Sequence, residues 1–236
     1  MTHATLNVSE SSLTPLAQVT LRQLMQTWFE FERNLAQVPI VKRVTAGTLT
    51  LEDYQKLLCH WYPQVIEGAR WISQTAASFD RRHLDIRGKV IRHAFEEHRD
   101  YNMLVQDYQQ TGGKAEVIEA AQRNAGTDAL HGFLMYRSGR ENPIDMLGAM
   151  WMIEGLGEKM AGEWAKHIRE ILKDQVEGHY TRFMDYHGQH DEGHMQHLYD
   201  LLNTAVVEEE VGAGIVKTAQ VVGKLYCLQL EETDRD

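Results

Sequence analysis

Apolar residues recur along most of the chain at the three- and four-residue spacing of α-helices, and alternating runs typical of β-strands are few. Residues 1–13 are mostly polar and predict a loose N-terminal arm. Thr14 and Pro15 are typical of a helix N-cap followed by the first helical residue. The first helix is therefore predicted over "LAQVTLRQLMQTWFEFERNLA".

Turn and capping residues divide the rest of the chain into further helices. Thr50 and Asp53 predict a capping box. The helix that follows is expected to run to Phe79, with a kink at Pro63. Further helices are predicted over residues 83–111, 115–123, 127–137, 142–172, 179–206 and 210–232. No linker separates these segments, so the sequence predicts one all-α domain of about seven helices over residues 14–236.

Charge and composition argue against several classes of protein. The net charge of −10 disfavours binding to nucleic acid or to an anionic membrane surface. Cys59 and Cys227 have no spacing typical of a zinc or redox site, which favours two reduced thiols. The N-terminus lacks the apolar core of a signal peptide, and no apolar run is long enough to span a bilayer. A cytoplasmic protein is therefore expected.

The stretch "YHGQHDEGHMQHL" is rich in histidine. On a helix, His187, Asp191 and His194 lie on one stripe, at positions i, i+4 and i+7. Two imidazoles and a carboxylate placed in this way suit Fe(II), Mn(II) or Zn(II). His190 and His197 fall toward the edge of the stripe and are interpreted as supporting or surface groups.

Glu154 is a second candidate, because it lies within the largely apolar segment "LGAMWMIEGLGEKMAG". A carboxylate inside a buried helix must be paired, protonated or bound to a cation. The neighbouring Gly155 and Gly157 allow either a close helix approach or an opening for a substrate.

A third candidate lies in "IRHAFEEHRDYN". Glu97 can share a helix face with His93, four residues earlier, or with Asp100, three residues later. The other charged residues of this segment are interpreted as solvated surface: Glu96, His98 and Arg99.

Together these positions supply a carboxylate from each of two helices and a His/Asp/His set from a third. Several carboxylates and a few imidazoles are the ligands that a di-iron carboxylate site requires. A ferritin-like bundle would need two Glu-x-x-His motifs, and the chain contains none. The ferritin-like form is therefore disfavoured.

From "VKRVTAGTLTLEDYQKLLCHWYPQVIEGARW" to the closing helix, the chain resembles the haem-oxygenase-like superfamily (TenA/PqqC-like fold), specifically its non-haem di-iron oxidases and oxygenases. The order of the candidate ligands carries the resemblance: Glu97, Glu154, and the H-x-x-x-D-x-x-H motif of His187, Asp191 and His194. Membership would imply a haem-oxygenase-like helical bundle, two Fe(II) ions per chain, activation of O2 and a helical pocket above the metals.

The chain departs from these relatives at one ligand. They carry a further histidine three or seven residues after the first glutamate, and those positions here are Asp100 and Leu104. The resemblance then leaves two groups to take its place, Asp100 or His93 from the preceding turn.

Other branches of the superfamily fit less well. Haem oxygenase uses an axial histidine on its first helix, and none lies between His3 and His60, so no haem is expected. Thiaminase-type relatives use a cysteine in the middle of the chain, far from Cys59 and Cys227. A cofactorless oxidase, like the one that completes pyrroloquinoline quinone, remains an alternative.

The expected function is that of a non-haem, iron-dependent oxidase or oxygenase acting with O2 on a small organic acid or amine. Its expected metal ligands are Glu97, Glu154, His187, Asp191 and His194, with Asp100 or His93 as the sixth. The alternative is a metal-free protein that binds a small ligand, in a pocket lined by Tyr62, Trp71, Trp151 and Tyr186. A homodimer is the default expectation for the assembly.

Overall fold

Two threonines fix where the first long helices begin, as their sequence context predicts. The Thr14 hydroxyl accepts a hydrogen bond from the Ala17 amide at 3.2 Å. Thr50 and Asp53 form the predicted capping box through two reciprocal bonds of 3.0 Å. These bonds satisfy backbone amides that a helix leaves without an internal partner.

The computed structural model describes residues 13–235, apart from the side chains of residues 190–193. All regular structure in this part of the chain is helical. The α-helices are α1 (Pro15–Leu35), α2 (Pro39–Ala46), α3 (Leu51–Val65), α4 (Gly68–Ala77), α5 (Leu84–Glu97), α6 (Tyr101–Gln110), α7 (Ala115–Glu119), α8 (Ala125–Ser138), α9 (Leu147–Leu156), α10 (Gly162–Leu172), α11 (Arg182–Ala205) and α12 (Glu209–Glu231). The arm expected over residues 1–13 lies, apart from Leu13, outside the described residues.

The expected number of about seven helices is wrong, because long segments are interrupted. The helix expected to reach Phe79 divides into α3 and α4 shortly after Pro63. The helix is thus broken, whereas only a kink is predicted from the sequence. Proline favours an interruption because it lacks a backbone donor and its ring hinders continuation of a helix. α6, in contrast, ends at the predicted glycines, where Gly112 adopts a left-handed φ of 87°.

Two further interruptions occur without any proline. The segment predicted over 83–111 divides into α5 and α6 at His98 to Asp100. The segment predicted over 142–172 contains the π-helical turn η4 (Gly157–Ala161) between α9 and α10. Wider turns of this kind are often found at functional sites.

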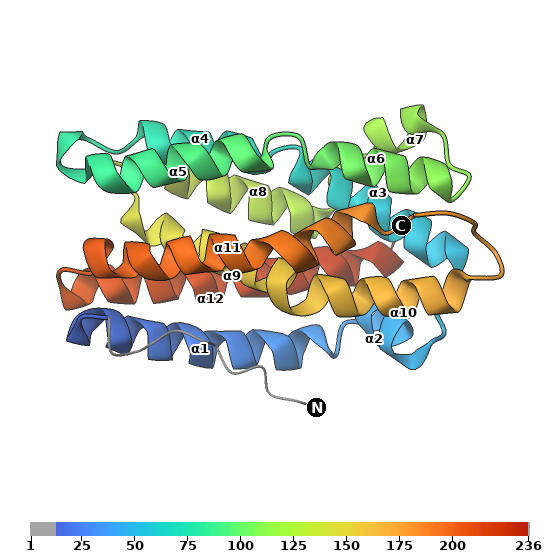
Figure 1. Cartoon of the computed structure of the whole chain (residues 1–236), viewed down its shortest axis with the longest axis horizontal. Helices are drawn as coiled ribbons and strands as arrows, with labels where there is room; N and C mark the ends of the chain where they lie inside the picture. Colours follow the sequence, from blue (N-terminus) through green and yellow to red (C-terminus); the bar gives the residue numbers. More distant parts are fainter. Residues whose placement is uncertain (1–12, 236) are drawn as a thin grey trace.

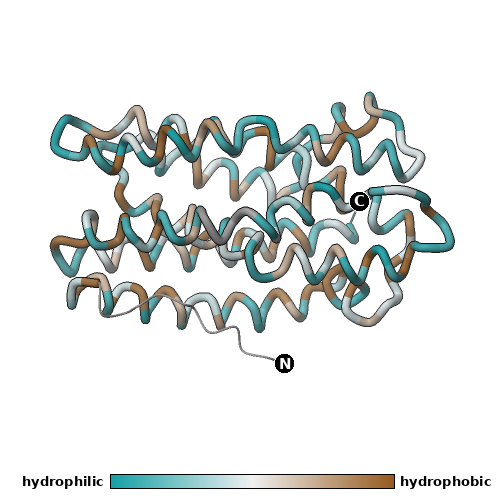
Figure 2. Tube along the Cα trace, in the orientation of Figure 1, coloured by the Kyte–Doolittle hydropathy of each residue, from teal (hydrophilic) through white to brown (hydrophobic). Residues whose placement is uncertain are grey.

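The long C-terminal helices organise the bundle (Figure 1). α12 packs against α1, α8 and α9, and α11 packs against α5, α6, α9 and α10. Hydrophilic and hydrophobic residues follow one another at short intervals along the helices (Figure 2). This pattern is expected when one face of each helix is buried and the other is exposed. α11 thereby contacts both α5 and α9.

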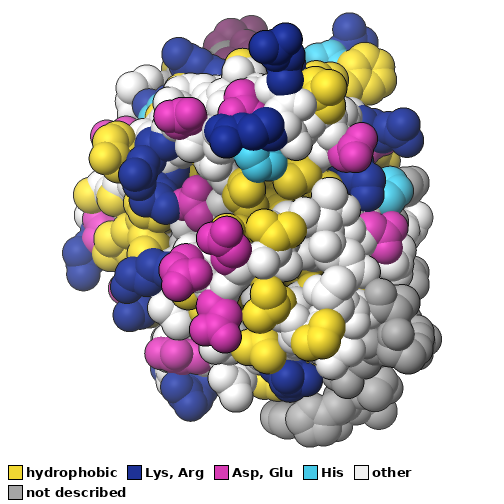
Figure 3. Space-filling view, turned by 90° about the vertical axis from the view of Figure 1, so that its left-hand side faces the viewer, with side chains coloured by type: hydrophobic (Ala, Val, Ile, Leu, Met, Phe, Trp, Pro, Cys, Tyr) yellow, Lys and Arg dark blue, Asp and Glu magenta, His cyan; other side chains and the backbone are white. Residues whose placement is uncertain are grey.

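The outer surface mixes charge and apolar groups. At the end where α5 begins and α11 ends, charged side chains of both signs surround a strip of hydrophobic side chains (Figure 3). Among the described residues, no helix combines the length and the apolar character needed to cross a bilayer.

Candidate metal centre

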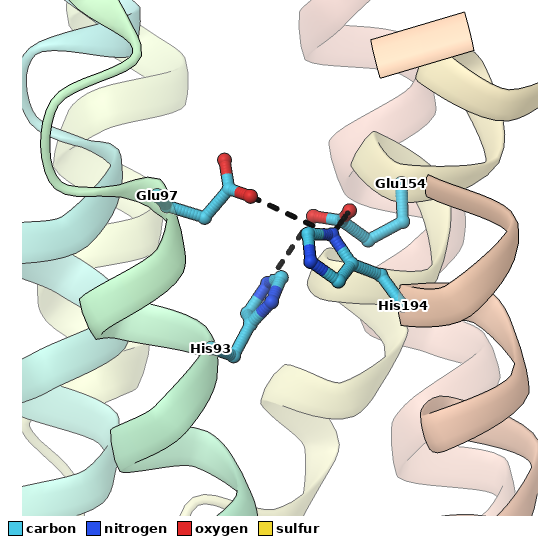
Figure 4. A group of neighbouring side chains, drawn as sticks. All are labelled: His93, Glu97, Glu154 and His194. Carbon is cyan, nitrogen blue, oxygen red and sulfur yellow. Dashed lines mark hydrogen bonds and ion pairs between the residues drawn. The ribbon is translucent and has the colours of Figure 1, made fainter. Parts of the chain in front are cut away.

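Four potential ligands converge from three helices (Figure 4). His93 and Glu97 extend from α5, Glu154 from α9 and His194 from α11. One donor atom from each lies within 4.8 Å of the others. Glu154 connects the two imidazoles, with Oε1 3.2 Å from His93 Nε2 and Oε2 2.8 Å from His194 Nδ1. Glu97 Oε1 completes the group, 3.5 Å from His194 Nδ1.

A second group shares one residue with the first. Glu97, Asp100 and His187 also place one donor atom each within 4.8 Å of one another. Asp100 Oδ2 lies 3.4 Å from His187 Nε2. Asp100 reaches this position because the chain turns between α5 and α6, so the unpredicted break in the helix contributes directly to the site. Glu97 therefore stands between two groups of potential ligands.

Burial raises the pKa of both central glutamates, but neighbouring charges shift the two in opposite directions. Burial and the nearby charge of Glu154 raise the pKa of Glu97 to about 8. Burial would also raise the pKa of Glu154, but His93 and His194 outweigh it and hold that pKa well below its usual value. Burial lowers the pKa of His93, and the Glu154 carboxylate overcomes this and raises it. Bound metal cations would stabilise the ionised form of both Glu97 and Glu154.

Glu96 is a contributor that single-helix reasoning missed. It was interpreted as solvated surface, yet its Oε2 lies 3.3 Å from His194 Nε2. His194 therefore presents Nδ1 to Glu97 and Glu154, and Nε2 to Glu96. A carboxylate on the second nitrogen of a ligating histidine fixes its tautomer and ring orientation. A ligating His194 is expected to have an acceptor for its second ring nitrogen. The sequence pattern of a single helix does not reveal which residue supplies it.

Two features position α11, which carries both histidines. The fully buried carboxylate of Asp107 on α6 accepts backbone hydrogen bonds from Arg182 at 2.9 Å and Phe183 at 3.0 Å. It thus caps the beginning of α11 from another helix. Beside His187, a Cβ at Gly188 would lie only 2.9 Å from the Gly162 amide nitrogen. The absence of a side chain there permits close contact with the segment that follows η4.

The remaining members of the histidine-rich stretch are either undescribed or at the surface. The side chains of His190 and Asp191 lie outside the described residues, so the expected Asp191 ligand stays a prediction. His197 is exposed. The two glycines beside Glu154 differ: Gly155 packs against the Trp28 ring, and Gly157 lines a cavity.

That cavity, here called the aromatic cavity, adjoins the candidate ligands. Its volume is about 750 Å³, counting its open mouth. Glu97, Glu154 and His187 contribute polar groups to its wall. Its main aromatic lining residues are Trp61, Trp71, Trp164, Phe183 and Tyr226. No described lining residue is Lys or Arg.

The aromatic residues expected in the pocket are only partly those that line it. Trp71 does so, whereas Trp151 packs edge-on against Trp28 in the core. Tyr62 packs against Tyr101, and Tyr186 against the ring of His187. Helical spacing could not distinguish core aromatics from lining aromatics, because both face inward.

The sequence matches no protein-family model and no curated protein. Solved structures match over nearly its whole length. A domain of unknown function with a haem oxygenase-like fold from Shewanella denitrificans is 17% identical, with a TM-score of 0.78, covering 91% of this chain and 92% of that one. A TenA homologue from Pseudomonas syringae pv. tomato is 15% identical, with a TM-score of 0.74 and coverages of 94% and 98%. Haem oxygenase-1 from Synechocystis, in complex with haem, is 16% identical, with a TM-score of 0.68 and coverages of 93% and 92%. The expected haem-oxygenase-like fold is confirmed.

Proposed function

We propose that the chain is a non-haem, iron-dependent oxidase or oxygenase that uses two Fe(II) ions and O2 on a small organic acid or amine. The observation that carries the proposal is the position of Glu97. Its carboxylate belongs to both groups of potential ligands, so this one side chain would help to hold both cations. The structural likeness supports only the fold on which this site is built.

The donor set fits iron. It consists of imidazole nitrogens and carboxylate oxygens, the ligands that non-haem iron sites use. His93 Nε2 and Glu97 Oε1 are buried and form no well-aligned hydrogen bond among the described residues. Buried polar atoms without such a bond are costly, and a cation would compensate both. His93 accordingly takes the place of the histidine missing after Glu97, and Asp100 serves the second group.

Bound Fe(II) would supply the electrons and open coordination positions for reduction of O2. The residues of the chain have separate tasks. Glu154 holds His93 and His194 in place, and Glu96 orients His194 through Nε2. When a cation binds, Glu97 would release to solvent the proton that its raised pKa retains in the metal-free protein.

The aromatic cavity would hold the organic substrate. Indole and phenyl rings exclude water and bind the apolar part of a small molecule. Because no described lining residue is Lys or Arg, an acidic substrate would depend chiefly on the cations for its counter-charge. An amine would instead face the carboxylates of Glu97 and Glu154.

Anaerobic titration of the metal-free chain with Fe(II), followed by iron analysis, tests the proposal. We expect about two irons per native chain and clearly fewer for His194→Ala. His167→Ala, which removes an exposed histidine of α10, is the matched control and should behave as the native chain. Admission of O2 should oxidise the iron faster in the native chain than in His194→Ala.

A native chain that binds no iron would refute the proposal. If such a chain still bound a small organic molecule in the aromatic cavity, the alternative function of a metal-free binding protein or cofactorless oxidase would be favoured.

A further inference from the structure

A second cavity adjoins the candidate metal centre. It lies between α5 and α11 and has a volume of about 590 Å³, counting its open mouth. His93 and His194 line this cavity, whereas Glu97, Glu154 and His187 line the aromatic cavity. Among the described residues the two cavities have no lining residue in common, and the potential ligands are divided between them.

The chemistry of the second cavity differs from that of the aromatic cavity. Its floor is aliphatic and includes the buried side chains of Val90, Met150 and Leu198. Its rim carries the exposed cations Lys89 and Arg92. Neither forms an ion pair with another residue in the described part of the chain. We call it the basic-rimmed cavity.

The charges of the described rim residues leave it positive. Among the described lining residues Glu96 is the acidic one, and its carboxylate faces His194 Nε2 at 3.3 Å. Lys89 and Arg92 therefore outnumber it, and the exposed ring of His197 adds no negative charge. In a chain with a net charge of −10, a positive rim above an aliphatic floor is a local reversal. Such a surface attracts anions and repels cations.

We propose that the basic-rimmed cavity binds a small organic carboxylate, with its head group at Lys89 and Arg92 and its apolar part on Val90, Met150 and Leu198. The carboxylate would lie on the His93 and His194 side of the metal centre, apart from the substrate in the aromatic cavity. Binding does not require metal, because none of the interactions involved uses one. The inference is thus independent of the proposed function.

Two methionines allow the test to tell the cavities apart. Met150 lines the basic-rimmed cavity and Met184 lines the aromatic cavity. The metal-free full-length chain, labelled with 13C at its methionine methyl groups, is titrated with hexanoate. The two signals are assigned with Met150→Leu and Met184→Leu. We expect the Met150 signal to shift with hexanoate and the Met184 signal to stay in place.

Charge is tested with the ligand and with the protein. Hexylamine has the same number of carbon atoms as hexanoate and the opposite charge, and it should leave the Met150 signal unchanged. Lys89→Gln combined with Arg92→Gln should weaken hexanoate binding about fivefold, since two exposed ion pairs are removed. Arg87→Gln on the same helix, which faces the groove toward α4, should bind hexanoate as the native chain does.

Three outcomes would overturn the inference: a shift of Met184 alone, equal shifts with hexylamine, or unchanged affinity in the double variant. Its failure is separate from that of the proposed function, because iron stoichiometry is measured without hexanoate and hexanoate binding without iron. The side chains of Arg87, Lys89 and Arg92 are partly or fully solvent-exposed, so the three glutamine substitutions should leave the thermal stability at its native value.

Discussion

At Glu97, burial and the neighbouring carboxylate of Glu154 act in the same direction on one proton. The pKa of this side chain rises from 4.5 to about 8 in the folded, metal-free protein. Between these values the unfolded chain releases a proton that the folded chain retains. Increasing pH therefore favours unfolding at this residue.

Replacement of Glu97 by glutamine removes this dependence. In the presence of a chelator, the thermal stability of Glu97→Gln relative to the native chain should increase from about pH 4.5 to about pH 8. Thermal unfolding followed by circular dichroism across this range measures the difference. A difference that stays constant with pH would show that Glu97 is ionised in the folded protein throughout.

The contact between Glu96 and His194 leads to a second expectation. Glu96→Ala removes the acceptor at His194 Nε2 but leaves every potential ligand in place. Metal affinity should fall about 10- to 100-fold, the range found when such supporting groups are lost. Anaerobic Fe(II) titration measures it, and Glu170→Ala on the exposed face of α10 is the control. Equal affinities in all three proteins would contradict the role of Glu96.

Residues could be singled out from the sequence where their chemistry conflicted with their local setting. Glu154 stood out because an acid within an apolar helix needs a partner, and Glu97 because it could pair with His93 or Asp100. Glu96 did not stand out, because its partner His194 belongs to a helix far along the chain. Contacts of this kind depend on how helices pack, which a one-dimensional pattern does not contain.

At the scale of helices, Gly188 limits how α11 packs. A Cβ at this position meets the backbone of Gly162, which cannot rotate away as a side chain can. Gly188→Ala should therefore cost about 1–3 kcal/mol in free energy of unfolding. It should also weaken metal binding, because the adjacent His187 would move with the helix.

Gly132 provides the matched control. It lies within α8, and a Cβ there would meet no atom within 4 Å. Gly132→Ala should stabilise the protein by about 0.5–1 kcal/mol, since alanine favours helix over glycine. Urea unfolding of both variants measures the two free energies of unfolding. A Gly188→Ala variant as stable as Gly132→Ala would show that α11 can move away from Gly162 without cost.

Helix starts were predictable where a side chain caps the backbone locally, as at Thr14 and Thr50. The break between α5 and α6 was not, because it contains no proline or glycine. It lies where Asp100 meets His187 of α11, a contact between helices far apart in the sequence. The π-helical turn η4 likewise has no sequence signature, although it lies directly after the helix that carries Glu154.

At the scale of the whole molecule, an all-α chain was predictable from helical periodicity. The haem-oxygenase-like fold was expected from the family resemblance carried by the order of its acidic and histidine residues. The number of helices was not, because interruptions shorter than a turn leave the periodicity nearly intact. The candidate metal centre draws its ligands from α5, α9 and α11, and therefore connects separate parts of the bundle.

A cation bound there should stabilise the entire fold. At a free metal concentration of 100 times Kd, each site should add about 2.7 kcal/mol to the free energy of unfolding. Unfolding in urea with and without anaerobic Fe(II) measures the gain, and a chelator should reverse it. His194→Ala should lose most of it. If Fe(II) left the free energy of unfolding of the native chain unchanged, a metal site built from three helices would be contradicted.

The aromatic cavity also gives the molecule an optical reporter. The chain has five tryptophans, and three of them, Trp61, Trp71 and Trp164, line this cavity, while none lines the basic-rimmed cavity. A molecule that enters the aromatic cavity displaces water beside these indoles and should change the intensity and wavelength of their emission. Hexanoate bound at the basic rim should leave that emission nearly unchanged. Fluorescence from the unlabelled protein could thus screen for substrates one compound at a time.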